Sequence, residues 1–75
     1  MKAIKTKCLS PTDFKGTRVK ASDGDGNNVT LSWDYAHDRP GNHQIAAEEL
    51  CLKMEWKGTL KGGWFENEMY WVFQD

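Results

Sequence analysis

The stretch TRVKASDGDGNNVTLSWDY, residues 17–35, decides the fold because two alternating segments flank a glycine-rich turn. Apolar and polar residues alternate over Thr17 to Ser22 and again over Asn28 to Tyr35, which is typical of strands with one buried side. The expected inward residues are Val19, Ala21, Val29, Leu31, Trp33 and Tyr35. The stretch therefore predicts an antiparallel hairpin.

The length of the turn sets the register of this hairpin. A two-residue turn at Asp25-Gly26 would set Val29 opposite Ser22 and Leu31 opposite Lys20, which mixes core positions with solvent positions. An odd-numbered loop centred on Asp25 instead pairs Ala21 with Val29 and Val19 with Leu31. Because facing residues share one side of a sheet, we predict the odd loop, with a glycine supplying the positive φ that it needs.

The same turn begins as a calcium-binding loop does, with oxygen ligands at Asp23, Asp25 and Asn27. Its sixth position is Asn28 where the calcium loop needs glycine, and its twelfth is Asp34 where the loop has glutamate. We therefore expect a turn without a metal ion. The two histidines also lack Cys or His neighbours at metal-ligand spacing.

A strand is predicted before the hairpin and a helix after it. Ala3 to Leu9 alternates, and Ser10 to Gly16 follows as a loop. Asn42 is the predicted N-cap of a helix that runs to about Trp56, with Gly58 closing it. The stripe expected on the sheet is His43, Ala47, Leu50, Cys51 and Met54, with Ala46 at its margin; Ile45 and Leu52 fall nearly opposite it.

The last segment predicts a second hairpin that turns near Glu66-Asn67. This turn sets apolar residues opposite one another, in the pairs Trp64–Met69, Gly62–Trp71 and Leu60–Phe73. It also places Gly63 opposite Tyr70, so a large ring is expected to cover each glycine. The predicted fold is a single α+β domain, residues 1–75, with one helix on an antiparallel sheet of about five strands (β-β-β-α-β-β).

Composition predicts the compartment and the state of the cysteines. No apolar stretch is long enough to cross a bilayer, and no apolar run follows the basic residues of the first segment as it would in a signal peptide. We expect a cytoplasmic protein without a membrane partner. Disulfides belong to oxidising compartments, so Cys8 and Cys51 are expected to be reduced and buried in the same core.

The net charge of −1 hides an uneven distribution. Residues 1–20 carry a balance of +5, and residues 21–75 carry −6. One helix covers only one face of a sheet, and alternation places cations and aromatic rings on the other face. The expected partner-binding residues are Lys5, Lys7, Arg18, Lys20, Lys61, Phe65 and Tyr70, with Ile45 and Leu52 as a secondary surface.

These patterns favour binding over catalysis. No Ser, Cys or Thr nucleophile can be assigned a base and an orienting acid, and no glycine-rich loop leads from a strand into a helix to hold a phosphate. We expect no enzymatic activity and no cofactor. Cations among aromatic rings suit single-stranded nucleic acid, but they are equally compatible with an ordinary solvated face.

Four segments resemble short open reading frames of bacteriophages and genomic islands: MKAIKTKCLSPT, GTRVKASDGDGN, AAEELCLKM and WKGTL. The order of strands, helix and aromatic hairpin is also similar to small type I anti-CRISPR proteins. The resemblance implies an inhibitor that occludes a host protein or nucleoprotein complex. A nucleic-acid-binding protein that uses the same sheet face and a structural homodimer are the alternatives.

Overall fold

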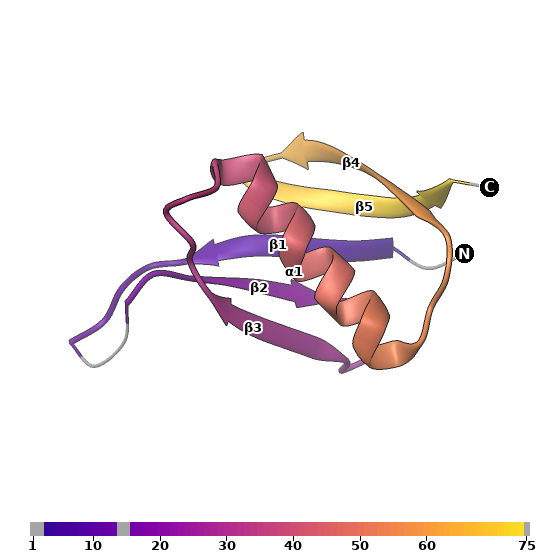
Figure 1. Ribbon diagram of the computed structural model, residues 1–75, viewed down its shortest axis with the longest axis horizontal. Coiled ribbons are helices and arrows are strands. Elements are labelled where there is room, and N and C mark those ends of the chain that lie inside the picture. The colour runs from indigo at the N-terminus through magenta and orange to yellow at the C-terminus, as the bar shows by residue number, and fades with distance from the viewer. Residues whose placement is uncertain (1–2, 14–15, 75) are drawn as a thin grey trace.

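The computed structural model describes residues 3–13 and 16–74 and shows one antiparallel sheet with one helix across it (Figure 1). The elements are β1 Ala3–Leu9, β2 Arg18–Ser22, β3 Asn28–Ser32, α1 Arg39–Met54, β4 Thr59–Phe65 and β5 Glu68–Gln74. Their order confirms the predicted α+β class. Residues 14 and 15, in the middle of the loop expected at 10–16, lie outside the described part.

The strand order is β3-β2-β1-β5-β4, so the first strand of the chain is the central one. Thr6 pairs with Ala21 of β2 on one side and with Met69 of β5 on the other. Both hairpins are therefore built onto β1, and α1 connects the two edge strands diagonally across one face (Figure 1).

Both predicted hairpin registers are confirmed. Ala21 pairs with Val29 and Val19 with Leu31, around a loop in which Gly24 and Gly26 have φ values of 86° and 97°. Asp23 stabilises this loop, because its carboxylate accepts hydrogen bonds from the backbone amides of Asp25 and Asn27 at 2.8 and 3.2 Å.

The second hairpin has the predicted pairs Trp64–Met69, Gly62–Trp71 and Leu60–Phe73. Its two central residues, Glu66 and Asn67, have φ values of 50° and 69°. Positive φ at both positions is typical of the type I′ turn, whose twist matches that of the strands.

The helix begins four residues earlier than predicted, and Asn42 is not its N-cap. Asp38 is the N-cap: its carboxylate accepts a hydrogen bond from the Gly41 amide at 2.8 Å, and Pro40 lies in the first turn. Asn42 is buried and bonds the preceding loop instead, through the Asp34 amide and carbonyl, both at 2.8 Å. Because both polar atoms of the Asn42 side chain bond the preceding loop, they are not available to cap the helix.

The helix also ends earlier than predicted, at Met54 rather than Trp56. Glu55 adopts a left-handed conformation, with φ 58°, and the amides of Glu55 and Trp56 bond the carbonyls of Leu52 and Cys51. This is the Schellman arrangement. It turns the Trp56 ring onto Phe73, with ring centroids 6.3 Å apart.

Strand β3 ends at Ser32, three residues before the predicted end. Asp34 starts a turn there: its side chain accepts a hydrogen bond from the Ala36 amide at 2.9 Å, and its carbonyl accepts one from the His37 amide at 3.1 Å. Tyr35 was expected to point inward, but it is 81% exposed because the chain has already left the sheet.

The core lies between α1 and the sheet. Its buried apolar members are Ile4, Val19, Ala21, Ala46, Ala47, Leu50, Met69 and Trp71. The expectation that both cysteines are buried was wrong for Cys8, which is exposed, while Cys51 is partly buried. Both thiols are free. Burial along the inward side of β1 stops at Thr6, so Cys8 has the correct parity but lies beyond the covered part of the strand.

The two adjacent glycines of β4 generate a test of the packing. A Cβ at Gly62 would lie 2.6 Å from the Trp71 ring, whereas a Cβ at Gly63 would have nothing within 4 Å. We predict that Gly62→Ala lowers the free energy of unfolding by about 1–3 kcal/mol through overpacking, and that Gly63→Ala leaves it unchanged or raises it slightly. Denaturant unfolding measures both; equal effects at the two positions would contradict the predicted packing.

Candidate functional site

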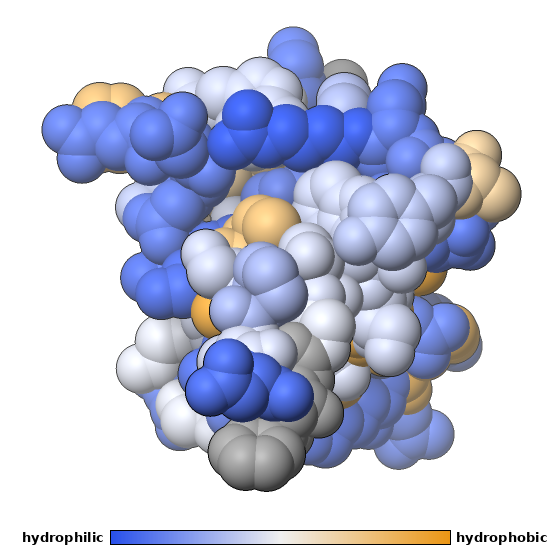
Figure 2. Space-filling view, turned by 90° about the vertical axis from the view of Figure 1, so that its left-hand side faces the viewer, coloured by the Kyte–Doolittle hydropathy of each residue, from blue (hydrophilic) through white to orange (hydrophobic). Residues whose placement is uncertain are grey.

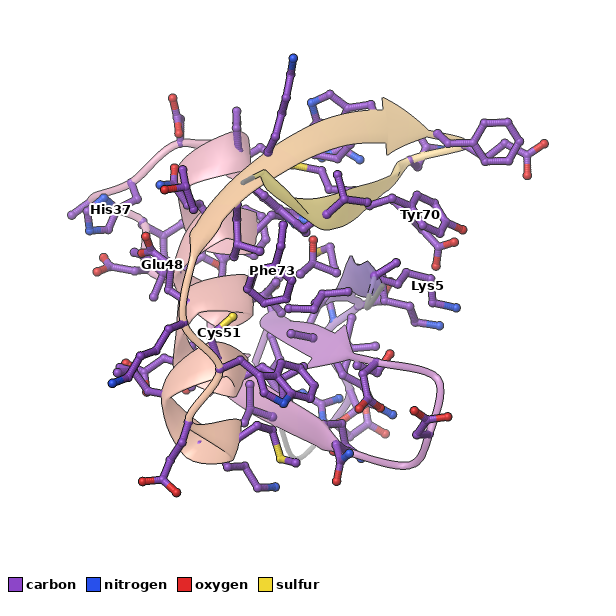
Figure 3. The ribbon with its side chains drawn as sticks, turned by 90° about the vertical axis from the view of Figure 1, so that its right-hand side faces the viewer. Lys5, His37, Glu48, Cys51, Tyr70 and Phe73 are labelled. Carbon is purple, nitrogen blue, oxygen red and sulfur yellow. The ribbon has the colours of Figure 1, made fainter. Side chains whose placement is uncertain are left out.

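The face of the sheet that points away from α1, called the reverse face below, collects the predicted partner-binding residues. The register places Lys7 opposite Lys20, and Lys5 opposite both Ser22 and Tyr70. Figure 3 shows Lys5 and Tyr70 on the side of the sheet opposite to Glu48 of the helix. By register and alternation, the reverse face carries Lys5, Lys7, Arg18, Lys20, Lys61, Phe65 and Tyr70.

The reverse face is strongly basic. Among its described residues, the five cations are accompanied by one acid, Glu68. The cations concentrate on β1 and β2, where Lys7 and Lys20 are direct cross-strand neighbours. Like charges at such positions lower stability, so folding alone does not account for this pair.

Two aromatic rings lie beside the cations, on β4 and β5. Phe65 is 62% exposed and Tyr70 is 39% exposed, and their centroids are 6.2 Å apart in an edge-to-face arrangement. The Tyr70 hydroxyl donates a hydrogen bond to Glu68 at 3.4 Å, which holds the ring toward Glu68 and its cross-strand partner Phe65. A small domain needs its large apolar side chains for the core, so exposed rings indicate a contact surface.

The expectation that Tyr70 covers Gly63 was wrong. The ring leans toward Phe65 and leaves the Gly63 backbone open. The result is a hollow of about 480 Å³ lined by Gly63, Phe65, Tyr70 and the neighbouring Trp64. At Gly62, by contrast, the Trp71 ring covers the backbone as predicted.

Arg18 forms a second feature of the reverse face, at the β2–β3 end of the sheet. It lines a pocket of about 660 Å³ together with Thr30, Ser32 and Tyr35. Its buried Nε has no hydrogen-bond partner among the described residues. Sequence reasoning did not include Tyr35 in the site, because alternation placed it in the core.

The secondary surface predicted on the helix is only partly present. Leu52 is 71% exposed, but Ile45 is partly buried, so the two side chains are not equally accessible to a partner. Leu52 lines a groove of about 520 Å³ between α1 and the start of β4, together with Cys51, Trp56 and Leu60. Burial raises the pKa of the Cys51 thiol, and the nearby Glu48 adds to the rise.

A polar cluster that sequence reasoning missed lies inside the core. His43 Nδ1 is 2.8 Å from Thr6 Oγ1, and the Trp71 indole donates to the same oxygen at 3.0 Å. His43 is fully buried and packs edge-on against Trp33 and Trp64, with centroids at 6.0 and 4.9 Å. Because no solvent reaches the imidazole, its geometry suits core packing and not chemistry on a ligand.

The described residues show no group of three or more His, Cys, Asp or Glu that could hold a metal ion. Within the same ranges, no helix is both long and apolar enough to cross a membrane. Figure 2 shows the end of the molecule at the left of Figure 1: hydrophilic residues dominate it, and hydrophobic surface is limited to small areas.

Comparisons of the chain with protein-family models, with curated protein sequences and with solved structures find no match. The geometry of the reverse face is therefore the basis for a functional proposal.

The buried histidine generates a pH prediction. Burial, and then the positive charge of Arg39, lower the pKa of His43, against an opposing effect of its bond with Thr6. Below about pH 6.5 the unfolded chain binds a proton at this residue that the folded chain does not, so stability falls as the pH falls. Above that pH both states are neutral and the contribution is flat.

We predict that the free energy of unfolding declines more steeply between about pH 6.5 and 5 in the wild type than in His43→Gln. The exposed His37 is present in both proteins, so it does not contribute to the difference between them. Urea unfolding at a series of pH values measures the two slopes. Identical slopes would show that His43 titrates normally in the folded protein.

Proposed function

We propose that this protein is a non-catalytic binding module that holds an anionic macromolecule on the reverse face of its sheet. The observation that carries the proposal is the charge of this face, with five cations and one acid among its described residues and no helix over it (Figure 3). Focused positive charge raises the local concentration of an anionic partner and accelerates its association.

Acidic residues on the helix side of the molecule make the charge distribution more uneven. The exposed acids of the helix, Glu48 and Glu49, lie on the other side of the sheet, so the two charges are separated by the thickness of the domain. A net charge of −1 therefore conceals a dipolar molecule that presents one face to a polyanion. A homodimer through the reverse face would bring the lysines of two copies together, which is unfavourable.

In the setting suggested by the resemblance to proteins of mobile elements, such a module acts as an inhibitor. A small domain that covers the nucleic acid of a host nucleoprotein complex blocks access to it sterically. This role needs no catalytic group, and the fully buried His43 is not available for one.

The test compares two charge reversals on a heparin column. Lys7→Glu removes a cation from the centre of the reverse face, whereas Lys57→Glu changes the net charge equally at an exposed position between α1 and β4. We predict that Lys7→Glu elutes at a clearly lower salt concentration than the wild type, and that Lys57→Glu elutes much closer to it.

The fold should survive this change. Lys7→Glu replaces a like-charge cross-strand pair with an opposite-charge pair, which stabilises by about 0.2–1 kcal/mol. The melting temperature of Lys7→Glu should therefore be equal to that of the wild type or slightly higher. Equal elution of the two variants would mean that net charge, and not the reverse face, governs binding.

A further inference from the structure

We infer that the anionic partner is a single-stranded nucleic acid, with one base in the Gly63 hollow and the backbone following the cations of β1 and β2. This inference rests on the proposed function and specifies its ligand. It is carried by the position of an open aromatic hollow directly beside a cluster of lysines.

The hollow has the properties of a base-stacking site. Its walls are the Phe65 and Tyr70 rings, and its floor is the bare backbone of Gly63, where no other atom comes within 4 Å of a Cβ position. Planar bases stack on aromatic rings irrespective of their sequence.

The charge pattern separates a place for a base from a place for phosphates. Glu68 lies on the aromatic side, opposite Phe65, where it would repel a phosphate but tolerates a neutral base. Lys5 on β1 is the cross-strand neighbour of Tyr70 on β5, and the pair that Lys7 of β1 forms with Lys20 of β2 lies one row further along β1. A strand with its base in the hollow therefore has its phosphates over the lysines.

Arg18 extends this path to the far end of the face. From β4 to β2 there are three inter-strand spacings, about 14 Å, which a short run of nucleotides spans. The Arg18 pocket supplies the Arg18 guanidinium, whose buried Nε has no hydrogen-bond partner among the described residues, together with the hydroxyls of Thr30 and Ser32. These groups suit a second phosphate of the same strand.

A duplex does not satisfy this arrangement, because its bases are paired and stacked with one another and leave only phosphates to contact. An acidic protein surface would use the lysines but would not need the hollow. A substitution that fills the hollow should therefore weaken the binding of a single strand but not the binding of a duplex or of an acidic protein.

The experiment measures fluorescence anisotropy with two labelled DNA strands of equal length and charge, one with bases and one abasic. Stacking is worth about 1–3 kcal/mol per base, so the wild type should bind the base-bearing strand about 5- to 150-fold more tightly than the abasic strand. Gly63→Val fills the hollow and should abolish this difference while leaving abasic binding unchanged.

Two further variants control the result. Thr59→Val introduces the same side chain at an exposed position of the same face and strand, and should bind both strands as the wild type does. Phe65→Ser removes one wall of the hollow at a position that is 62% exposed, so the substitution should leave the fold intact. It should reproduce the effect of Gly63→Val, and it therefore tests the hollow even if Gly63→Val does not fold.

The outcomes distinguish the two proposals. If the wild type binds both strands equally, or if Gly63→Val and Phe65→Ser retain the preference for bases, the single-strand inference is wrong. The proposed function survives that result if Lys7→Glu still weakens binding to both strands and to heparin. Absence of binding to either strand and to heparin at low salt overturns both.

Discussion

The hydroxyl of Thr6, buried at the centre of the sheet, is the contact on which the rest of the structure depends. It lies on β1, accepts the indole proton of Trp71 on β5, and is hydrogen-bonded to His43 of α1. One oxygen thus joins the central strand, the C-terminal hairpin and the helix. A buried Trp or His that loses this partner keeps an unsatisfied polar group, at a cost of about 1–3 kcal/mol for each. These bonds lie on the face of the sheet that the helix covers.

Covering one face leaves the other uncovered, and this constraint leads to the functional proposal. A domain of 75 residues has little apolar surface to spare, yet Phe65 and Tyr70 remain exposed on the reverse face. Lys7 and Lys20 are opposed there at a cost to folding. Features that do not contribute to stability are expected where a surface has a binding role.

The sequence predicts the sheet well because side-chain alternation allows only one consistent set of partners. A shift of one residue would move every inward residue to the outside, so the registers of both hairpins follow from the apolar pattern alone. The collection of the cations and rings on the reverse face follows from the same parity. Alternation does not show where coverage ends, which is why Cys8 and Tyr35 were placed in the core.

Other features depend on interactions that a local pattern does not contain. Asn is a residue type that often caps helices, but the side-chain amide of Asn42 bonds the backbone of the preceding loop instead. The true start of the helix, with Asp38 as N-cap and Pro40 in the first turn, could have been recognised from the sequence. The open hollow at Gly63 depends on the direction of the Tyr70 ring, which the Phe65 and Glu68 contacts determine. The His43 cluster combines residues of β1, β5 and α1, so its hydrogen bonds form only when these three elements are packed together.

The most direct test of the central claim is a map of backbone amide chemical shifts by NMR as a single-stranded oligonucleotide is added to the full chain. The account predicts saturable shifts on the reverse face, concentrated at Lys5, Lys7, Lys20 and Gly63, with little change around Leu52 in the groove beside the helix. Shifts confined to the helix-side groove, with the amides of β1 and β2 unmoved, would contradict it.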